Sequence, residues 1–253
     1  MLITDVLKGS SLLATLGLVS GCCIGVSAGA QSAGGSQSNT QAVQSESQAA
    51  SSGCPNGMQP AADGLLDDWE DGNTQLLVDG ARDGYWWTHH DPNGSTIEPN
   101  PLAPEAGGPD GSTQTMRISG QTSSADGAYG SSLGVNFSTS GAYDASKYAG
   151  ISFKAKAAGS SVKKVRFKIG DVNTHQDGAV CTDCWNHFGK DVTRTEEWQE
   201  YVIPFSELKQ GDGWGDPRPQ SLTPEKLYNL DWSIGPGATF ELWIDDIQFH
   251  ECK

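Results

Sequence analysis

Basic residues are scarce in this sequence. Its 253 residues include 16 Lys and Arg against 31 Asp and Glu, so the formal net charge at pH 7 is −15. A surface with this charge repels phosphate backbones and anionic lipid headgroups. We therefore expect no nucleic-acid partner, whereas neutral ligands and divalent cations are favoured.

Motifs of zinc proteases and of nucleotide-binding enzymes are also missing. The sequence contains no His-Glu-x-x-His and no phosphate-binding loop. Paired carboxylates can cleave glycosides, but Asp and Glu are too common here for a pair to indicate a hydrolase. We therefore assign no catalytic residue and expect a protein that is not an enzyme.

The N-terminal part lacks a segment long enough to span a bilayer. The uncharged, mostly apolar run from Ser10 to Gly21 is too short for this. It ends in Val19-Ser20-Gly21-Cys22, which resembles a bacterial lipobox; cleavage after Ala28-Gly29-Ala30 is the alternative. We predict a signal peptide at 1–21 and lipidation of Cys22. The protein would then be exported to the cell envelope and contact the membrane only through this anchor.

The segment that follows has almost no charge and few large apolar residues. Gln31 to Gly53 consists mainly of Gln, Ser, Ala and Gly, and Glu46 is its only charged residue. Such a composition cannot bury a core. We expect a disordered tether at 22–53 and a single folded domain at 54–253.

A long amphipathic helical pattern and an internal repeat are absent from the domain as well. Glycine (32 residues) and proline (12 residues) are frequent, which favours many turns and short strands. Alternation is clear at 164–169, where Val165, Phe167 and Ile169 point inward between basic residues. We therefore predict an all-β jelly-roll sandwich of two antiparallel sheets. The expected strands are 65–69, 75–78, 82–94, 115–119, 128–137, 150–156, 164–169, 198–205, 227–234 and 240–252, with a long loop at 175–189.

The last predicted strand contains two adjacent carboxylates. By strict alternation, Asp246 shares a face with Leu242 and Ile244, whereas Trp243 and the residues Ile247 and Phe249 fall on the opposite face. We therefore expect Asp246 to point inward. An inward carboxylate needs a charge partner or a metal.

A second acidic stretch, at 65–73, lies near the start of the domain. We expect the first and last strands to lie side by side, so that the two acidic stretches supply the oxygen ligands that calcium needs. Solvated acidic turns are the simpler alternative. The candidate ligands of this structural calcium are Glu70, Asp71, Gly72, Asn73, Asp245 and Asp246.

Four cysteines lie beyond the leader, and they permit three pairings. Because an exported protein favours disulfides, we expect Cys54 with Cys252 and Cys181 with Cys184. The alternatives for the second pair are a zinc site with His187 and a redox Cys-x-x-Cys, although the latter lacks the strand-to-helix context of thioredoxins.

Three motifs, in this order, resemble those of a known fold family. They are the opening stretch 67–72 (Asp-Asp-Trp-Glu-Asp-Gly), the strand 198–205 (Trp-Gln-Glu-Tyr-Val-Ile-Pro-Phe) and the closing stretch 242–247 (Leu-Trp-Ile-Asp-Asp-Ile). Together they are similar to jelly-roll carbohydrate-binding modules of the galactose-binding-like group, in the style of family 11. The resemblance implies a structural calcium between the opening turn and the last strand. It also implies glycans bound to aromatic side chains on a concave sheet or its rim loops.

Tryptophan numbers 8, and several of these residues lie in predicted loops or at strand ends. Sugars stack their apolar faces on Trp and Tyr, while Asp, Asn and His bind the hydroxyls. Trp69, Trp198, Trp232 and Trp243 are the candidates for the core. The candidate sugar-binding residues are Trp86, Trp87, His90, Asp91, Tyr129, Trp185, His187 and Trp214. Consecutive residues point to opposite faces of a strand, so one of Trp86 and Trp87 should be core and the other surface.

The function that these features favour is non-catalytic binding of a poly- or oligosaccharide by a monomeric surface lipoprotein. An envelope adhesion or assembly module with a protein partner is the alternative, because the same sandwich serves both. A glycoside hydrolase is less favoured.

Overall fold

The structure is a computed structural model that describes residues 53–159 and 164–253. These residues fall in one compact unit, 47–253. The predicted signal peptide at 1–21, Cys22 and nearly all of the predicted tether lie outside the described residues. Within the described ranges, no helix is long and apolar enough to cross a membrane.

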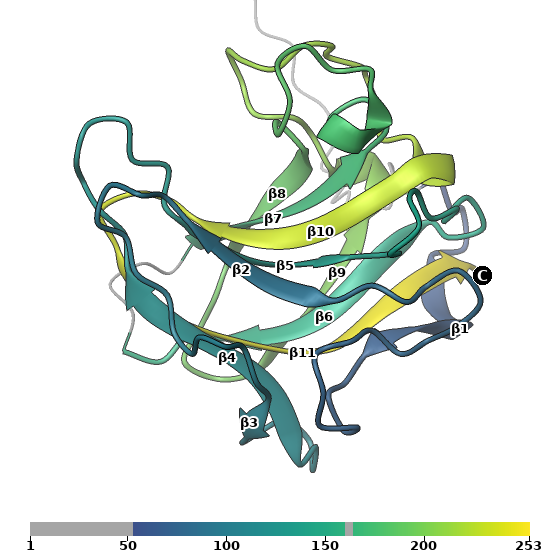
Figure 1. The fold of residues 1–253 in the computed structure, drawn as a ribbon. Coiled ribbons are helices and arrows are strands. Elements are labelled where there is room, and N and C mark those ends of the chain that lie inside the picture. Colours follow the sequence, from purple (N-terminus) through teal and green to yellow (C-terminus); the bar gives the residue numbers. More distant parts are fainter. Residues whose placement is uncertain (1–52, 160–163) are drawn as a thin grey trace, which may run out of the picture. The chain divides into compact units, whose positions relative to one another are not determined.

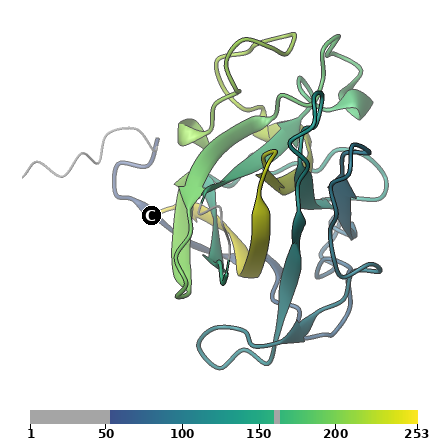
Figure 2. The ribbon, with the colours of Figure 1, turned by 90° about the vertical axis from the view of Figure 1, so that its left-hand side faces the viewer.

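Two antiparallel sheets form a sandwich, as predicted (Figures 1 and 2). The six-stranded sheet has the order β3-β4-β11-β6-β9, with β1 paired to β11; the five-stranded sheet has the order β2-β5-β10-β7-β8. Three 3-10 turns connect strands: η1 (Gln176–Gly178), η2 (Phe205–Glu207) and η3 (Pro224–Lys226). The strands are β1 (Met58–Asp67), β2 (Trp86–His90), β3 (Glu105–Ala106), β4 (Gln114–Gln121), β5 (Ser131–Asn136), β6 (Gly150–Lys156), β7 (Lys164–Asp171), β8 (Phe188–Thr193), β9 (Gln199–Pro204), β10 (Leu227–Ile234) and β11 (Thr239–Cys252).

The core lies between the inner faces of the two sheets. Trp232 of β10 is fully buried and meets Phe153 of β6 edge to face, with ring centroids 5.0 Å apart. Such contacts between aromatic rings add to the hydrophobic effect that holds the sheets together. Trp69 is also fully buried, as predicted for a core residue. Trp198 and Trp243 are not: each is partly exposed and packs on the Lys156 ammonium group.

A β-bulge in β11 overturns the predicted orientation of its carboxylates. Ile244 and Ile247 are both fully buried, and Asp245 is buried as well. Regular alternation would place Ile244 and Ile247, which are three positions apart, on opposite faces of the sheet. Asp246 has a φ of 49°, and the register with β6 shifts between Asp245 and Gln248. The extra residue turns the second half of the strand over. Asp245 is therefore the buried carboxylate. It lies opposite Lys154 on the outer face of the sheet and is covered by Gly108 and Ser112, whereas Asp246 is partly exposed.

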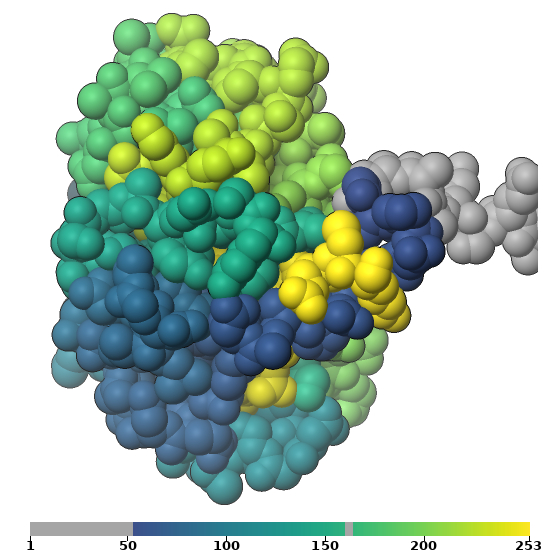
Figure 3. Space-filling model, turned by 90° about the vertical axis from the view of Figure 1, so that its right-hand side faces the viewer, coloured from purple at the N-terminus to yellow at the C-terminus, as the bar shows by residue number. Residues whose placement is uncertain are grey.

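The two ends of the domain lie side by side, as predicted. β1 runs antiparallel to the end of β11, with Met58 opposite Cys252. A disulfide joins Cys54 to Cys252, whose Cα atoms are 5.1 Å apart. Figure 3 shows the first described residues against the yellow C-terminal strand.

Two segments differ from the prediction. The segment 75–78 forms a single isolated bridge, Gln75 with Tyr85, because the chain there turns back within ten residues. Conversely, the predicted loop 175–189 ends in β8, which starts at Phe188 and completes the five-stranded sheet. Phe188 and Val192 are the only buried large apolar side chains of β8, too few for a recognisable alternation.

Candidate functional site

The outer face of the five-stranded sheet carries a groove of about 1120 Å³. The β7–β8 and β9–β10 loops rise above this face at one end (Figure 1). A groove of this size with aromatic and polar walls is a typical ligand site. It is lined by Trp87, Thr88, His89, Tyr129, Gly130, Ser131, Ser132, Asn136, Arg166, Lys168, His175, Trp185, Asn186, His187, Gly211, Trp214, Asn229, Asp231 and Ser233.

The strand register orders the floor of this groove into rows that run across the strands. One row, which we call the middle row, consists of Trp87, Gly134, Asp231, Lys168 and Gly189, each paired with the next. Residues opposite each other in neighbouring strands share a face of the sheet. The middle row therefore places an indole and an ion pair on the same surface, with glycines between and beyond them.

Trp87 lies across β5 because Gly134 has no side chain. A Cβ atom at Gly134 would stand 2.4 Å from Cζ2 of the indole, which no real contact allows. The indole Nε1 donates a hydrogen bond to Asn136 Oδ1 at 3.1 Å. The ring is thus held in one orientation on the groove floor before any ligand arrives.

Trp86 points the other way, into the core. It is 6% exposed, and its Nε1 donates to Asp67 Oδ2 at 2.6 Å. Burial raises the pKa of Asp67 to about 7. The prediction that these consecutive tryptophans divide between core and surface is correct, and Trp86 is removed from the candidate binding residues.

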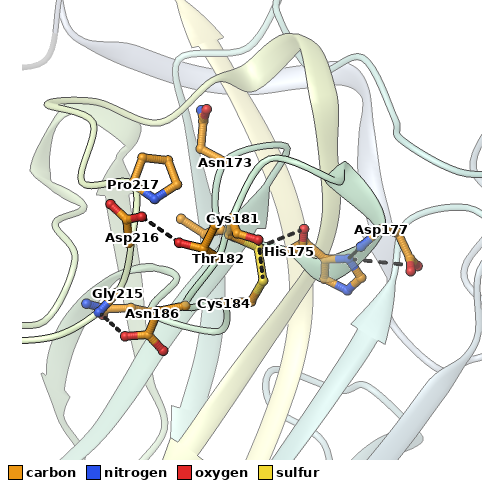
Figure 4. The surroundings of a disulfide bond; sticks show 12 residues. Asn173, His175, Asp177, Cys181, Thr182, Cys184, Asn186, Gly215, Asp216 and Pro217 are labelled. Atoms are coloured by element: carbon orange, nitrogen blue, oxygen red, sulfur yellow. Dashed lines mark hydrogen bonds and ion pairs between the residues drawn. A yellow bond between two sulfur atoms is a disulfide. The ribbon is translucent and has the colours of Figure 1, made fainter.

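Trp185 lines the loop end of the groove, one residue after the disulfide between Cys181 and Cys184. Figure 4 shows this disulfide. It is 50% exposed, and its φ of 78° lies in the left-handed region, which is rare for a bulky side chain. Its backbone N–H donates to the Thr174 carbonyl at 2.9 Å, which fixes the loop to the end of β7. Such strained residues concentrate at functional sites.

A second loop brings Trp214 beside this disulfide loop. Trp214 is 48% exposed, and Asn186 Nδ2 donates to its carbonyl at 2.6 Å. Asn186 also exchanges two hydrogen bonds with the backbone of Gly211. Figure 4 shows a further link, in which Thr182 donates to the Asp216 carboxylate at 2.5 Å. The two exposed indoles are therefore carried by loops that brace each other.

Below these indoles, two buried polar atoms face the groove without a partner among the described residues. They are Nε2 of His187 and Oδ1 of Asn229, and both residues are 2% exposed. The other imidazole nitrogen of His187 contacts Thr174 Oγ1 at 3.0 Å. Burial and the nearby Lys168 charge keep the pKa of His187 well below its usual range. A neutral imidazole and an amide oxygen are suited to binding a hydroxyl group.

The opposite end of the groove carries Tyr129. Its ring is 56% exposed and stacks on His89, with centroids 5.7 Å apart and planes 9° apart. Aromatic surfaces thus stand at the two ends of the groove and, with Trp87, on its floor over β5.

Two predicted sugar-binding residues lie outside the groove. Asp91 is fully buried and accepts hydrogen bonds from Ser95 Oγ at 2.7 Å and from the Gly130 N–H at 2.8 Å, so it organises a turn. His90 follows His89 in the strand and points away from the groove, into a separate depression of about 490 Å³ beside residues 95–100. Alternation along β2 explains the position of His90, whereas Asp91 lies beyond the end of β2, in the turn that it organises.

A family profile described as carbohydrate binding domain 30 matches residues 78–251, more than half of the chain. The chain belongs to this family. It is a carbohydrate-binding module, a non-catalytic kind of domain. A search among curated proteins found no match.

Solved structures confirm the fold of this family 30 module. The chain is similar to a family 11 carbohydrate-binding module from Clostridium thermocellum in complex with a β-1,3-1,4-mixed-linked tetrasaccharide, with 18% identity and a TM-score of 0.51 over 76% of this chain and 98% of that chain. It is also similar to a crystal structure of a family 30 module, with 14% identity and a TM-score of 0.50 over 75% of this chain and 87% of that chain. The jelly-roll resemblance drawn from the sequence is therefore confirmed.

The sequence analysis did not assign several polar residues to the groove of this family 30 module. These residues are His89, Asn136, Arg166, Lys168, His175, Asn186, Asn229, Asp231 and Ser233. A signal was present, because polar positions alternate with buried apolar ones in both β7 and β10. What the sequence does not reveal is that these two strands pair, which places their polar positions side by side.

The predicted calcium ligands divide into two groups in this module. Glu70 and Asp245 meet at the Ser112 hydroxyl, whose oxygen lies 2.8 Å from Glu70 Oε1 and 3.2 Å from Asp245 Oδ2. The Gln114 carbonyl lies 2.7 Å from the same hydroxyl. Asp71 instead bonds to Asn73 in an exposed turn, Gly72 lies between them, and Asp246 pairs with Lys154. Among the described residues, no group of three or more His, Cys, Asp or Glu is arranged to hold a metal ion.

The oxygens around Ser112 nevertheless suit a hard cation. A hydroxyl has one hydrogen and cannot donate to three acceptors, so this pocket is crowded with oxygens. Burial and the neighbouring Asp246 raise the pKa of Asp245 to about 7. A calcium ion prefers such a set of carboxylate, carbonyl and hydroxyl oxygens.

Proposed function

We propose that the groove binds an internal segment of a linear β-glucan. The observation that carries this proposal is the indole of Trp87, which lies across Gly134 on an otherwise polar floor. Neighbouring strands are about 4.8 Å apart, so the five strands span roughly 19 Å, about the length of a tetrasaccharide. The mixed-linked tetrasaccharide bound by the similar family 11 module supports this ligand class.

The shape of the proposed ligand follows from the aromatic positions. Trp87 would stack on the apolar face of one sugar unit, while Trp185 and Trp214 at one end and Tyr129 at the other would contact outer units. Polar side chains between them would bind hydroxyl groups, as in most sugar sites. An extended chain fits this spacing better than a single sugar unit.

Isothermal titration of the purified protein with mixed-linkage β-glucan, xylan, galactan and an α-glucan tests this proposal. We expect binding of the β-glucan alone, in the micromolar to millimolar range. Absence of binding to every polysaccharide would contradict the proposal.

Replacing Trp185 by alanine is expected to weaken β-glucan binding about tenfold, which corresponds to about 1.4 kcal/mol. The melting temperature should stay unchanged, because the indole is half exposed. Val180→Ala is the matched control, since Val180 is an exposed apolar residue of the same loop that does not line the groove. Equal affinities of Trp185→Ala and wild type would remove Trp185 from the site.

We also propose a structural calcium ion held by Glu70, Asp245, Ser112 and the Gln114 carbonyl. The crowded oxygens and the buried carboxylate support it. The ion would tie the turn after β1 to the β3–β4 connection and to β11. The ion would stabilise the fold and would not contact the glycan, because these residues lie in or beside the six-stranded sheet, whereas the groove lies on the five-stranded sheet.

We further propose that the protein is a lipoprotein of the bacterial cell envelope, anchored through Cys22. The lipobox-like sequence supports this localisation. Cys22→Ala is expected to release the protein into the soluble fraction, since the apolar leader is too short to hold it stably in a membrane. Membrane fractionation of the variant checks this, and a mature chain that begins at Gln31 would contradict it.

A further inference from the structure

Lys168 and Asp231 form an ion pair at the centre of the groove floor. Lys168 Nζ lies 3.1 Å from Asp231 Oδ1, and the side chains are 20% and 4% exposed. They are directly opposite each other in β7 and β10, between Gly134 and Gly189 of the middle row. The two glycines leave the pair as the only long side chains next to the Trp87 indole in that row.

The pair retains unused hydrogen-bonding capacity. Asp231 Oδ1 contacts Lys168 and also accepts a hydrogen bond from Ser233 Oγ at 2.7 Å. Among the described residues, the hydrogen bond and the ion pair of Asp231 both use Oδ1, so Oδ2 stays available, and an ammonium group has three N–H donors. The groove therefore offers an acceptor and a donor, both charged, within about 3 Å of each other.

We propose that Lys168 and Asp231 bind two adjacent hydroxyl groups of one sugar unit, next to the unit that stacks on Trp87. This inference rests on the proposed β-glucan function. One hydroxyl donates to the Asp231 carboxylate and its neighbour accepts from the Lys168 ammonium, in charge-assisted hydrogen bonds. The spacing of the two charged atoms is close to that of the oxygens in a vicinal diol.

Such a pair determines specificity more than affinity. When a ligand lacks the hydroxyl that would pair with a buried polar group, that group loses its water without gaining a hydrogen-bond partner. The site therefore discriminates strongly against such a ligand. A glucan unit substituted on either hydroxyl is excluded from this position for the same reason. The middle row thus selects an unsubstituted diol beside a stacked ring.

The neighbouring ion pair in the groove has a different role. Arg166 pairs with Asp191 at 3.2 Å, and it also donates to the Lys209 carbonyl at 2.6 Å. Its hydrogen bonds hold the β9–β10 connection in place. Among the described residues, Lys168 pairs with Asp231 and donates to no backbone carbonyl, so its remaining donors are available to a ligand.

The test is titration of wild type and Asp231→Asn with the mixed-linked tetrasaccharide and with analogues of it that each lack one hydroxyl. We expect one analogue to bind wild type at least tenfold more weakly than the parent. We expect Asp231→Asn to bind the parent at least tenfold more weakly and to lose this preference. Glu241→Gln is the matched control, because Glu241 pairs with Arg117 at 2.9 Å on the outer face of the other sheet; its affinities should equal those of wild type.

Lys168→Gln gives the same information if Asp231→Asn does not fold, since Lys168 is the more exposed partner. A variant that keeps the wild-type preference for the parent overturns the inference and leaves the β-glucan function standing. Wild type that binds no tetrasaccharide overturns both. Melting temperatures without ligand distinguish a structural role of the pair from a role in binding. A purely structural role would lower the melting temperature of the variants and leave their preference for the parent tetrasaccharide unchanged.

Discussion

Trp87→Ala should abolish detectable β-glucan binding and leave the fold intact. The indole is the aromatic surface of the groove floor, and it is held in place by Gly134 beneath it and by Asn136. An aromatic anchor of this kind contributes more to binding than the polar contacts around it. Titration should show a loss of at least a hundredfold, about 2.7 kcal/mol, with a melting temperature within a few degrees of wild type.

Trp86→Ala is the matched substitution on the other face of the same strand. Removing a buried Trp costs about 3–5 kcal/mol, and it also leaves the Asp67 carboxylate without its indole partner. We expect a large drop in the urea midpoint, and near-normal affinity in the folded fraction. If Trp87→Ala destabilises the protein as much as Trp86→Ala, or binds β-glucan like wild type, the groove assignment is wrong.

Asp245→Asn should have opposite effects with and without calcium. In EDTA the variant should be more stable than wild type near pH 8. Burial raises the folded-state pKa of Asp245 to about 7, above its ordinary value of 3.8. The favourable contribution of the protonated carboxyl is complete below pH 3.8 and is lost as the pH rises through 7, at a cost of at most about 4 kcal/mol. An amide keeps the hydrogen bond from the Asp246 N–H and carries no charge.

With calcium the order should reverse. An ion at a hundredfold excess over its dissociation constant stabilises the wild type by about 2.7 kcal/mol, and the variant should gain almost nothing. Asp71→Asn is the control, since Asp71 lies in a separate exposed turn; it should respond to calcium like wild type. Identical melting of metal-loaded and EDTA-treated wild type would contradict the calcium site, while the pH effect of Asp245 would remain.

The sequence predicts the features that depend on local patterns. It does not predict the features that depend on which strands pair with each other. Alternation identified β6 and β7, and the predicted strand 227–234, the Cys54–Cys252 disulfide and the adjacent end strands are also confirmed. Alternation alone could not say which of Trp86 and Trp87 faces the core. That depends on which sheet β2 joins and on the side from which the second sheet covers it.

The error at Asp245 and Asp246 has a different physical origin. A bulge adds one residue to β11, and no sequence signal marks it, because Asp246 takes a positive φ without being glycine. The same limit applies to the groove. The polar positions of β7 and β10 are visible in the sequence, but their alignment in one row with Trp87 is a property of the strand register.

The disulfide at the domain ends also determines how the module responds to mechanical force. A pull on the chain before Cys54 would, without the bond, peel β1 away from β11 one hydrogen bond at a time. With the bond, the load passes directly to Cys252 and so to β11, which is held along its length by β4 and β6. A load applied to the chain before Cys54 therefore bypasses β1 and is shared across the centre of the six-stranded sheet.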